Sequence, residues 1–148
     1  MAWLNEEVLG TEGDLFCTAC YGTLVNGVDG WRLESTAAGH PLPILATTRG
    51  TWTVGQPGSL LGVLESLTTV TETSELEPGD VVVFYTDGIT DLPPPYGIST
   101  DELIELVQKL RHSQTAEEVA DAIHRSLLDR VPDRSRQDDV ALLVLRVD

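Results

Sequence analysis

An abrupt change from an apolar run to a carboxylate constrains this chain more than any other feature. Residues 81–85, VVVFY, are followed directly by Thr86, Asp87 and Gly88. An apolar run without polar alternation is typical of a strand covered on both faces, and residues 77–80 before it have the composition of a turn. The sequence therefore predicts a buried strand that delivers Asp87 to an edge of the core. Gly88 can approach a ligand closely or adopt a positive φ angle.

A second acidic pair precedes another apolar run near the C-terminus. Asp138 and Asp139 stand immediately before residues 140–147, which we expect to form the final strand. If this pair converges in space with Asp87, the two strand ends make an oxygen-rich site. Such a site suits a hard divalent cation such as Mg²⁺ or Mn²⁺.

Length and composition indicate one globular domain over residues 1–148, with 41% apolar and 22% charged residues. The net charge of −15 argues against nucleic acid or an anionic membrane surface as the main partner. No apolar run approaches the length of about 18 residues that a membrane-spanning helix needs. The N-terminus lacks the basic and apolar regions of a signal peptide, so we expect a cytoplasmic protein.

Cys17 and Cys20 match the C-x-x-C spacing of redox and zinc sites, but they lie in a segment with strand composition. Residues i and i+3 of a strand lie on opposite faces, roughly 10 Å apart, whereas a disulfide requires Cα atoms within about 7 Å. We therefore interpret both cysteines as small structural residues of a strand.

The remaining periodicity predicts one early helix and a series of strands. The helix is short and amphipathic, covers residues 3–9 and ends at Gly10. Two strands form a hairpin around a loop at residues 26–30, which is rich in residues that tolerate positive φ angles. The predicted strands cover residues 15–25, 31–36, 42–46, 67–73, 81–85 and 140–147.

Two later helices have clear starting signals. Ser99 with Glu102, and Thr115 with Glu118, fit the capping box, in which a hydroxyl and a carboxylate satisfy free amide donors at a helix start. Each helix carries one apolar stripe and should lie on a sheet. The order of helix, strands, two helices and strand favours an α+β fold with helices packed outside antiparallel sheets.

Four segments together resemble the SpoIIE-type branch of the PPM (protein phosphatase 2C-like) serine/threonine phosphatases. The segments are TAAGHPLPIL at 36–45, with Ala37 where the family has asparagine, QPGSLLGV at 56–63, LEPGDVVVFYTDGITD at 76–91 and QDDV at 137–140. The resemblance spans nearly the whole chain. It implies an αββα sandwich with two Mn²⁺ or Mg²⁺ ions between the sheets, and a water held by the ions that attacks phosphoserine or phosphothreonine.

The resemblance also assigns roles to individual residues. Asp87, Gly88 and Asp138 fall on metal-ligand positions, while Asp91 and Asp139 fall beside them as accessory groups. No protein side chain serves as the nucleophile; two cations would instead acidify the shared water and neutralise phosphoryl oxygens.

Purely structural roles are the alternative for each of these residues. Asp87 alone could be a turn carboxylate, and Asp138 and Asp139 could be charges that guard an apolar strand against aggregation. His40 could act as a base or contact phosphate, but a histidine in a Gly-His-Pro turn is more often a structural hydrogen-bonding group, so we count it as accessory.

Two motifs of the family's N-terminal part, Gly-Asp-x-x-Asp and Asp-Val-x-Gly-His-Gly, do not occur in the 148 residues. The resemblance thus covers the C-terminal two-thirds to three-quarters of the family domain. It implies hydrolysis of phosphoserine on an anti-sigma-factor antagonist in bacterial partner switching. The alternative is an inactive phosphatase-like remnant that serves as an interaction or regulatory module. An incomplete sandwich would leave a strand edge or an apolar sheet face open, so we also expect a homodimer or else a partly disordered chain.

Overall fold

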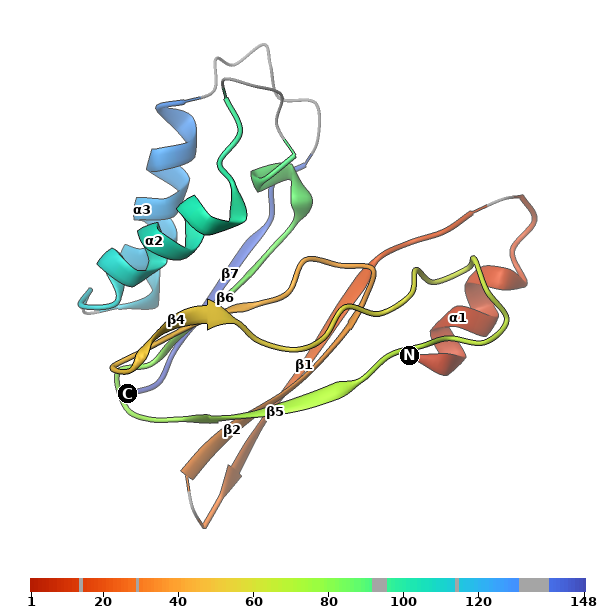
Figure 1. The fold of residues 1–148 in the computed structure, drawn as a ribbon, viewed down its shortest axis with the longest axis horizontal. Coiled ribbons are helices and arrows are strands. Elements are labelled where there is room, and N and C mark those ends of the chain that lie inside the picture. Colours follow the sequence, from red (N-terminus) through yellow and green to blue (C-terminus); the bar gives the residue numbers. More distant parts are fainter. Residues whose placement is uncertain (14, 29, 92–95, 114, 131–138) are drawn as a thin grey trace. The chain divides into compact units, whose positions relative to one another are not determined.

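The computed structural model describes residues 1–13, 15–28, 30–91, 96–113, 115–130 and 139–148 (Figure 1). The chain divides into two compact units. Unit 1 comprises Met1–Leu42 and Val54–Leu76, and unit 2 comprises Pro43–Thr53 and Glu77–Asp148. In the described residues, no helix is both long and apolar enough to cross a membrane.

Unit 1 contains helix α1 (Ala2–Leu9) and an antiparallel sheet in the order β1-β2-β5. The strands are β1 (Ala19–Gly27), β2 (Gly30–Ala38) and β5 (Thr71–Leu76). β1 and β2 form the predicted hairpin, with pairs from Ala19↔Ala38 to Gly27↔Gly30. Gly30 has the positive φ angle, 108°, that the turn composition predicted.

One buried amide anchors α1 to the long loop between β4 and β5. Asn5 is 1% exposed. Its Nδ2 donates to the Leu64 carbonyl at 2.9 Å, and its Oδ1 accepts from the Gly62 N–H at 2.9 Å. Because a buried amide is tolerated only when it is hydrogen-bonded, this asparagine specifies where the loop meets the helix.

Unit 2 contains a four-stranded antiparallel sheet in the order β4-β3-β6-β7. Its strands are β3 (Ile44–Thr47), β4 (Gly50–Thr53), β6 (Val81–Tyr85) and β7 (Leu142–Arg146). A single 3₁₀ turn, η1 (Asp87–Ile89), follows β6, and two helices complete the unit, α2 (Thr100–Leu110) and α3 (Ala116–Leu128). Figure 1 shows α2 and α3 beside the sheet.

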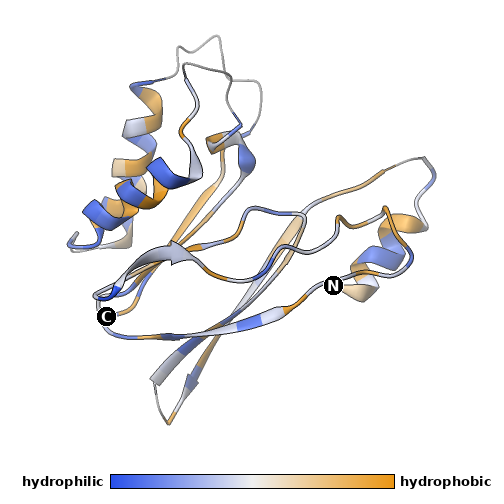
Figure 2. Cartoon of the chain, viewed as in Figure 1, coloured by the Kyte–Doolittle hydropathy of each residue, from blue (hydrophilic) through white to orange (hydrophobic). Residues whose placement is uncertain are grey.

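The apolar stripes of the two helices form a core with the sheet. Leu103 and Val107 of α2, and Val119 and Ile123 of α3, are fully buried with Val81 and Val83 of β6. Full burial of such a side chain contributes roughly 1.5–3 kcal/mol. Apolar colour follows β6 and β7, while the helices present both polar and apolar faces (Figure 2). The predicted α+β class of antiparallel sheets with helices is therefore confirmed.

Several boundaries differ from those predicted. Regular pairing of β1 begins at Ala19 rather than at residue 15, and β5 covers Thr71–Leu76 rather than residues 67–73. Strand β4 was not predicted. Gly10 ends α1, but in a right-handed conformation with φ −76° instead of the left-handed one that often closes helices.

Candidate functional site

Thr86 joins the C-terminal end of β6 to the N-terminal end of β7. Its hydroxyl donates to the Asp139 carbonyl at 3.1 Å and accepts from the Ala141 N–H at 2.9 Å. Its own N–H donates to the Ala141 carbonyl at 3.1 Å. These bonds extend the β6–β7 pairing beyond Tyr85↔Leu142 and place the backbone that follows β6 against the backbone that precedes β7.

Gly88 permits this close approach. A Cβ atom at this position would lie 2.5 Å from the Asp139 carbonyl oxygen and 3.1 Å from its carbonyl carbon. The 2.5 Å separation is shorter than real Cβ atoms show, and its partner is backbone, so any other residue would force the two segments apart. The glycine of the Asp-Gly pair is thus required by packing against the second acidic segment.

Asp87 and Asp91 share one tight turn. The Asp87 carbonyl accepts hydrogen bonds from the N–H groups of Thr90 at 2.8 Å and Asp91 at 2.7 Å. The Thr90 hydroxyl donates to Asp91 Oδ1 at 3.3 Å. Both aspartates are exposed. The turn therefore holds two solvent-accessible carboxylates at the edge to which β6 leads.

The second acidic pair is described only in part. Asp139 is exposed, and its carbonyl is the acceptor for Thr86. Asp138 lies outside the described residues. Among the described residues, which do not include Asp138, no group of three or more His, Cys, Asp or Glu side chains could hold a metal. The metal-ligand roles of Asp87, Gly88 and Asp138 remain predictions.

His40 belongs to unit 1 and is half-buried. Its Nδ1 lies 2.9 Å from the Thr18 hydroxyl. The two cysteines are free thiols, Cys17 exposed and Cys20 half-buried, and burial raises the pKa of the Cys20 thiol. In the described structure Cys20 is a residue of β1, as its strand composition predicted.

Sequence reasoning missed Thr86. Thr86 belongs to the Tyr-Thr-Asp-Gly segment that indicated Asp87 and Gly88, yet no role was predicted for it. The available signal was the side chain itself, since a hydroxyl that directly follows a buried apolar strand can donate and accept at once. Only the β6–β7 register shows which partners it meets.

A family profile described as Stage II sporulation protein E (SpoIIE) matches residues 1–148. The chain belongs to the SpoIIE family. Protein IcfG from Synechocystis sp. is 26% identical over 151 residues, a match that covers 96% of this chain and 23% of that protein. The SpoIIE-family chain thus spans less than a quarter of the length of this relative.

Solved structures agree on the fold. The RsbU and RsbW domains of Rv1364c from Mycobacterium tuberculosis match with a TM-score of 0.75 and 26% identity, over 96% of this chain and 39% of that one. The phosphatase domain of SpoIIE from Bacillus subtilis matches with a TM-score of 0.66 and 16% identity, over 99% and 72%. A Mn-presoaked form of that domain matches with a TM-score of 0.61 and 15% identity, over 88% of this chain and 57% of that one. The SpoIIE-family chain therefore has a PP2C-like phosphatase fold.

Proposed function

We propose that this chain is the C-terminal part of a metal-dependent serine phosphatase domain that hydrolyses phosphoserine. The observation that supports this most is the junction built by Thr86, which brings the Asp87-Gly88 turn against Asp139. Membership of the SpoIIE family supports the same reaction class.

The oxygen-rich donor set fits a hard divalent cation. Asp87, Gly88 through its carbonyl, and Asp138 would hold Mn²⁺ or Mg²⁺, which when bound would supply an acidified water and offset charge on the phosphoryl oxygens. Thr86 would fix the spacing of the two carboxylate-bearing ends, because it directly precedes Asp87 and its hydroxyl is bonded to both Asp139 and Ala141 of the other segment. Gly88 leaves no side chain between the ends. Asp91 would add negative charge beside Asp87 from the same turn.

A phosphorylated regulatory protein is the proposed substrate, of the anti-sigma-factor antagonist type. The support is the family and the likeness to a protein whose RsbU and RsbW domains were solved together. The proposed nucleophile is water, so specificity must come from docking of the phosphoprotein rather than from a reactive side chain.

Metal binding by the 148 residues alone should be weak. Mg²⁺ dehydrates reluctantly and gains little from one or two carboxylates, and the two N-terminal ligand motifs of the family do not occur in this sequence. The second proposed function class is an interaction module that binds the phosphoprotein without turnover.

The test is Mn²⁺ titration calorimetry and release of phosphate from a phosphoserine form of an anti-sigma-factor antagonist, with excess Mn²⁺. We expect weak Mn²⁺ binding and a slow rate, both reduced further by Asp87→Asn. Glu105→Gln on α2, an exposed carboxylate outside the site, should leave both unchanged. Equal Mn²⁺ binding by the wild type and Asp87→Asn would remove Asp87 from the site. Tight phosphoprotein binding with no phosphate release would favour the interaction module.

A further inference from the structure

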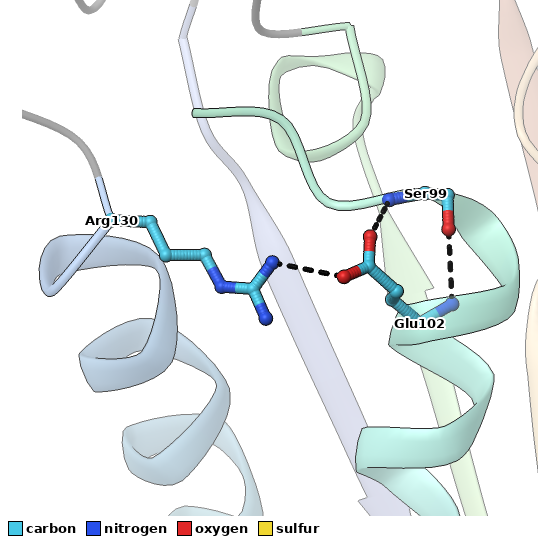
Figure 3. Close-up of polar contacts among 3 residues, drawn as sticks. All are labelled: Ser99, Glu102 and Arg130. Atoms are coloured by element: carbon cyan, nitrogen blue, oxygen red, sulfur yellow. Dashed lines mark hydrogen bonds and ion pairs between the residues drawn. The ribbon is translucent and has the colours of Figure 1, made fainter. Parts of the chain in front are cut away.

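The eight residues between Arg130 and Asp139, VPDRSRQD, contain Asp138, the proposed metal ligand of the second acidic pair. The residues on both sides of this segment are bonded to one stretch of unit 2, which runs from β6 through η1 to α2. Asp139 follows the segment, and its carbonyl accepts from the Thr86 hydroxyl at 3.1 Å. Arg130 precedes the segment, and its Nη1 donates to Glu102 Oε1 at 3.2 Å (Figure 3). The chain is therefore held on either side of the segment that contains Asp138.

The Glu102 carboxylate has two partners, one for each oxygen. Oε2 accepts from the Ser99 N–H at 2.9 Å within the capping box, and Oε1 accepts from Arg130. Because the capping box already orders the Glu102 side chain, pairing with Arg130 costs little additional side-chain entropy. The ion pair thus has a defined geometry although both side chains are partly exposed.

The pair also joins two helix ends whose charges suit it. Glu102 lies in the first turn of α2, and Arg130 directly follows Asp129, the C-cap of α3. The Arg130 N–H donates to the Leu127 carbonyl at 3.1 Å, so its backbone still belongs to this helix end. A carboxylate at a helix N-terminus and a cation at a helix C-terminus both interact favourably with the helix dipole.

We propose that the Arg130–Glu102 ion pair is a positioning contact for the proposed metal site, a role that rests on the function proposed above. It fixes the point from which the chain leaves α3 toward Asp138, as Thr86 fixes the point at which the chain reaches β7. A segment held at both ends samples fewer conformations than one held at a single end. Asp138 therefore stays nearer to the position in which it can share a cation with Asp87.

Charge alone predicts the opposite effect of losing this arginine. Neutralising Arg130 makes the surroundings of the site more negative, which by Coulomb attraction should strengthen the binding of Mn²⁺. Loss of positioning should weaken that binding. The sign of the change in Mn²⁺ affinity therefore distinguishes the two effects. Exposed ion pairs contribute little to global stability, so we expect the change in cation binding without a change in unfolding.

Mn²⁺ titration calorimetry on Arg130→Met, Glu102→Gln and the double variant tests the pair. We expect Arg130→Met to weaken Mn²⁺ binding about two- to fivefold, the range that an exposed ion pair can supply. In the Glu102→Gln background, which keeps an oxygen for the Ser99 N–H, the same change should not weaken binding further. Arg130→Lys keeps a cation for this single contact and should recover most of the affinity. Arg125→Met is the control, because it removes the same charge from α3 at a residue whose Nε donates to the Asp121 carbonyl at 3.2 Å, within the helix. It should not weaken binding.

Hydrogen exchange of the Ala141 amide in the metal-free protein measures the same coupling without a cation. This N–H donates to the Thr86 hydroxyl at 2.9 Å. Its exchange should become several-fold faster in Arg130→Met and Glu102→Gln but not in Arg125→Met. Tighter Mn²⁺ binding by Arg130→Met, equal weakening in both backgrounds, or unchanged exchange of Ala141 would overturn the positioning role and leave the metal site standing. Absence of Mn²⁺ binding by the wild type would reject the proposed metal site and this role with it.

Discussion

A methyl group at residue 88 should be enough to separate the two acidic segments. We expect Gly88→Ala to lower the free energy of unfolding by about 1–3 kcal/mol. The added Cβ would lie 2.5 Å from the Asp139 carbonyl oxygen, so it must displace backbone rather than a flexible side chain. Gly27→Ala is the control, since its Cβ would meet nothing closer than 3.8 Å. Urea unfolding followed by circular dichroism measures both. Equal stability of the two variants would contradict the packing role of Gly88.

Asp80 is a buried carboxylate of unit 2, at 2% exposure. Burial raises the pKa of Asp80 above 3.8, and the nearby Glu77 carboxylate adds to the rise. The Glu77 N–H, which donates to Asp80 Oδ2 at 2.9 Å, lowers this pKa. The guanidinium groups of Arg49 and Arg111 also lower it, but burial has the largest effect. The folded state therefore holds the proton more tightly than the unfolded state. This contribution to stability is full below the unfolded pKa and is lost as the pH rises through the folded pKa.

Asp80→Asn should remove that dependence. Asparagine keeps an oxygen acceptor for the Glu77 N–H and cannot ionise. We expect the free energy of unfolding of the wild type to fall relative to that of the variant as the pH rises from 3.8 through the higher pKa that Asp80 has in the folded protein. Urea unfolding at a series of pH values gives the difference. A difference that grows with pH would show that the arginines outweigh burial, and a difference that stays constant would show that the two effects cancel; either result contradicts the prediction.

At the scale of helices, the capping boxes were predictable because every contact in them is local. Ser99 accepts from the Glu102 N–H at 3.2 Å, and the Glu102 carboxylate accepts from the Ser99 N–H at 2.9 Å (Figure 3). The Ser99 N–H, and then the Arg130 guanidinium, lower the pKa of Glu102. The same arrangement begins α3 at Thr115.

Removal of the Ser99 hydroxyl should cost about 1 kcal/mol of stability, the usual effect of losing a helix N-cap. Arg130→Ala is the comparison, because Arg130 reaches the same Glu102 at 3.2 Å through side chains that are 41% and 48% exposed. Exposed ion pairs contribute little, so this variant should leave the unfolding midpoint unchanged. Equal losses in Ser99→Ala and Arg130→Ala would show that the ion pair, not the cap, holds this helix start.

Strands were less predictable than helices because pairing partners decide their limits. Gly50–Thr53 forms β4 because it pairs with β3. Its sequence, one glycine, two threonines and one tryptophan, shows no apolar periodicity from which a strand could be predicted. The apolar run of β6 was predicted with its observed bounds, since burial on both faces leaves a pattern in sequence. At the candidate site, motifs indicated Asp87 and Gly88, whereas the Thr86 bridge depends on the register with β7.

At the scale of the whole molecule, charge is distributed unevenly along the sequence. The net charge is −15, yet residues 15–28, which include β1, carry no Asp, Glu, Lys or Arg. β1 is also an end strand of the order β1-β2-β5 in the described part of unit 1. A nine-residue edge without charge is suited to pairing with another strand. This part of the surface can approach a second copy without placing like charges directly opposite each other.

We therefore expect weak homodimerisation through β1. At about 0.15 M salt the Debye length is about 8 Å, so repulsion between distant carboxylates is largely screened, and the dimer fraction should rise with salt. Leu24→Lys places a charge on β1 at a side chain that is 43% exposed, and Val63→Lys makes the same change in a loop at 52% exposure. Sedimentation equilibrium should show dimer loss in Leu24→Lys alone. A monomer at high micromolar concentration and high salt would mean that the edge of β1 does not pair with itself.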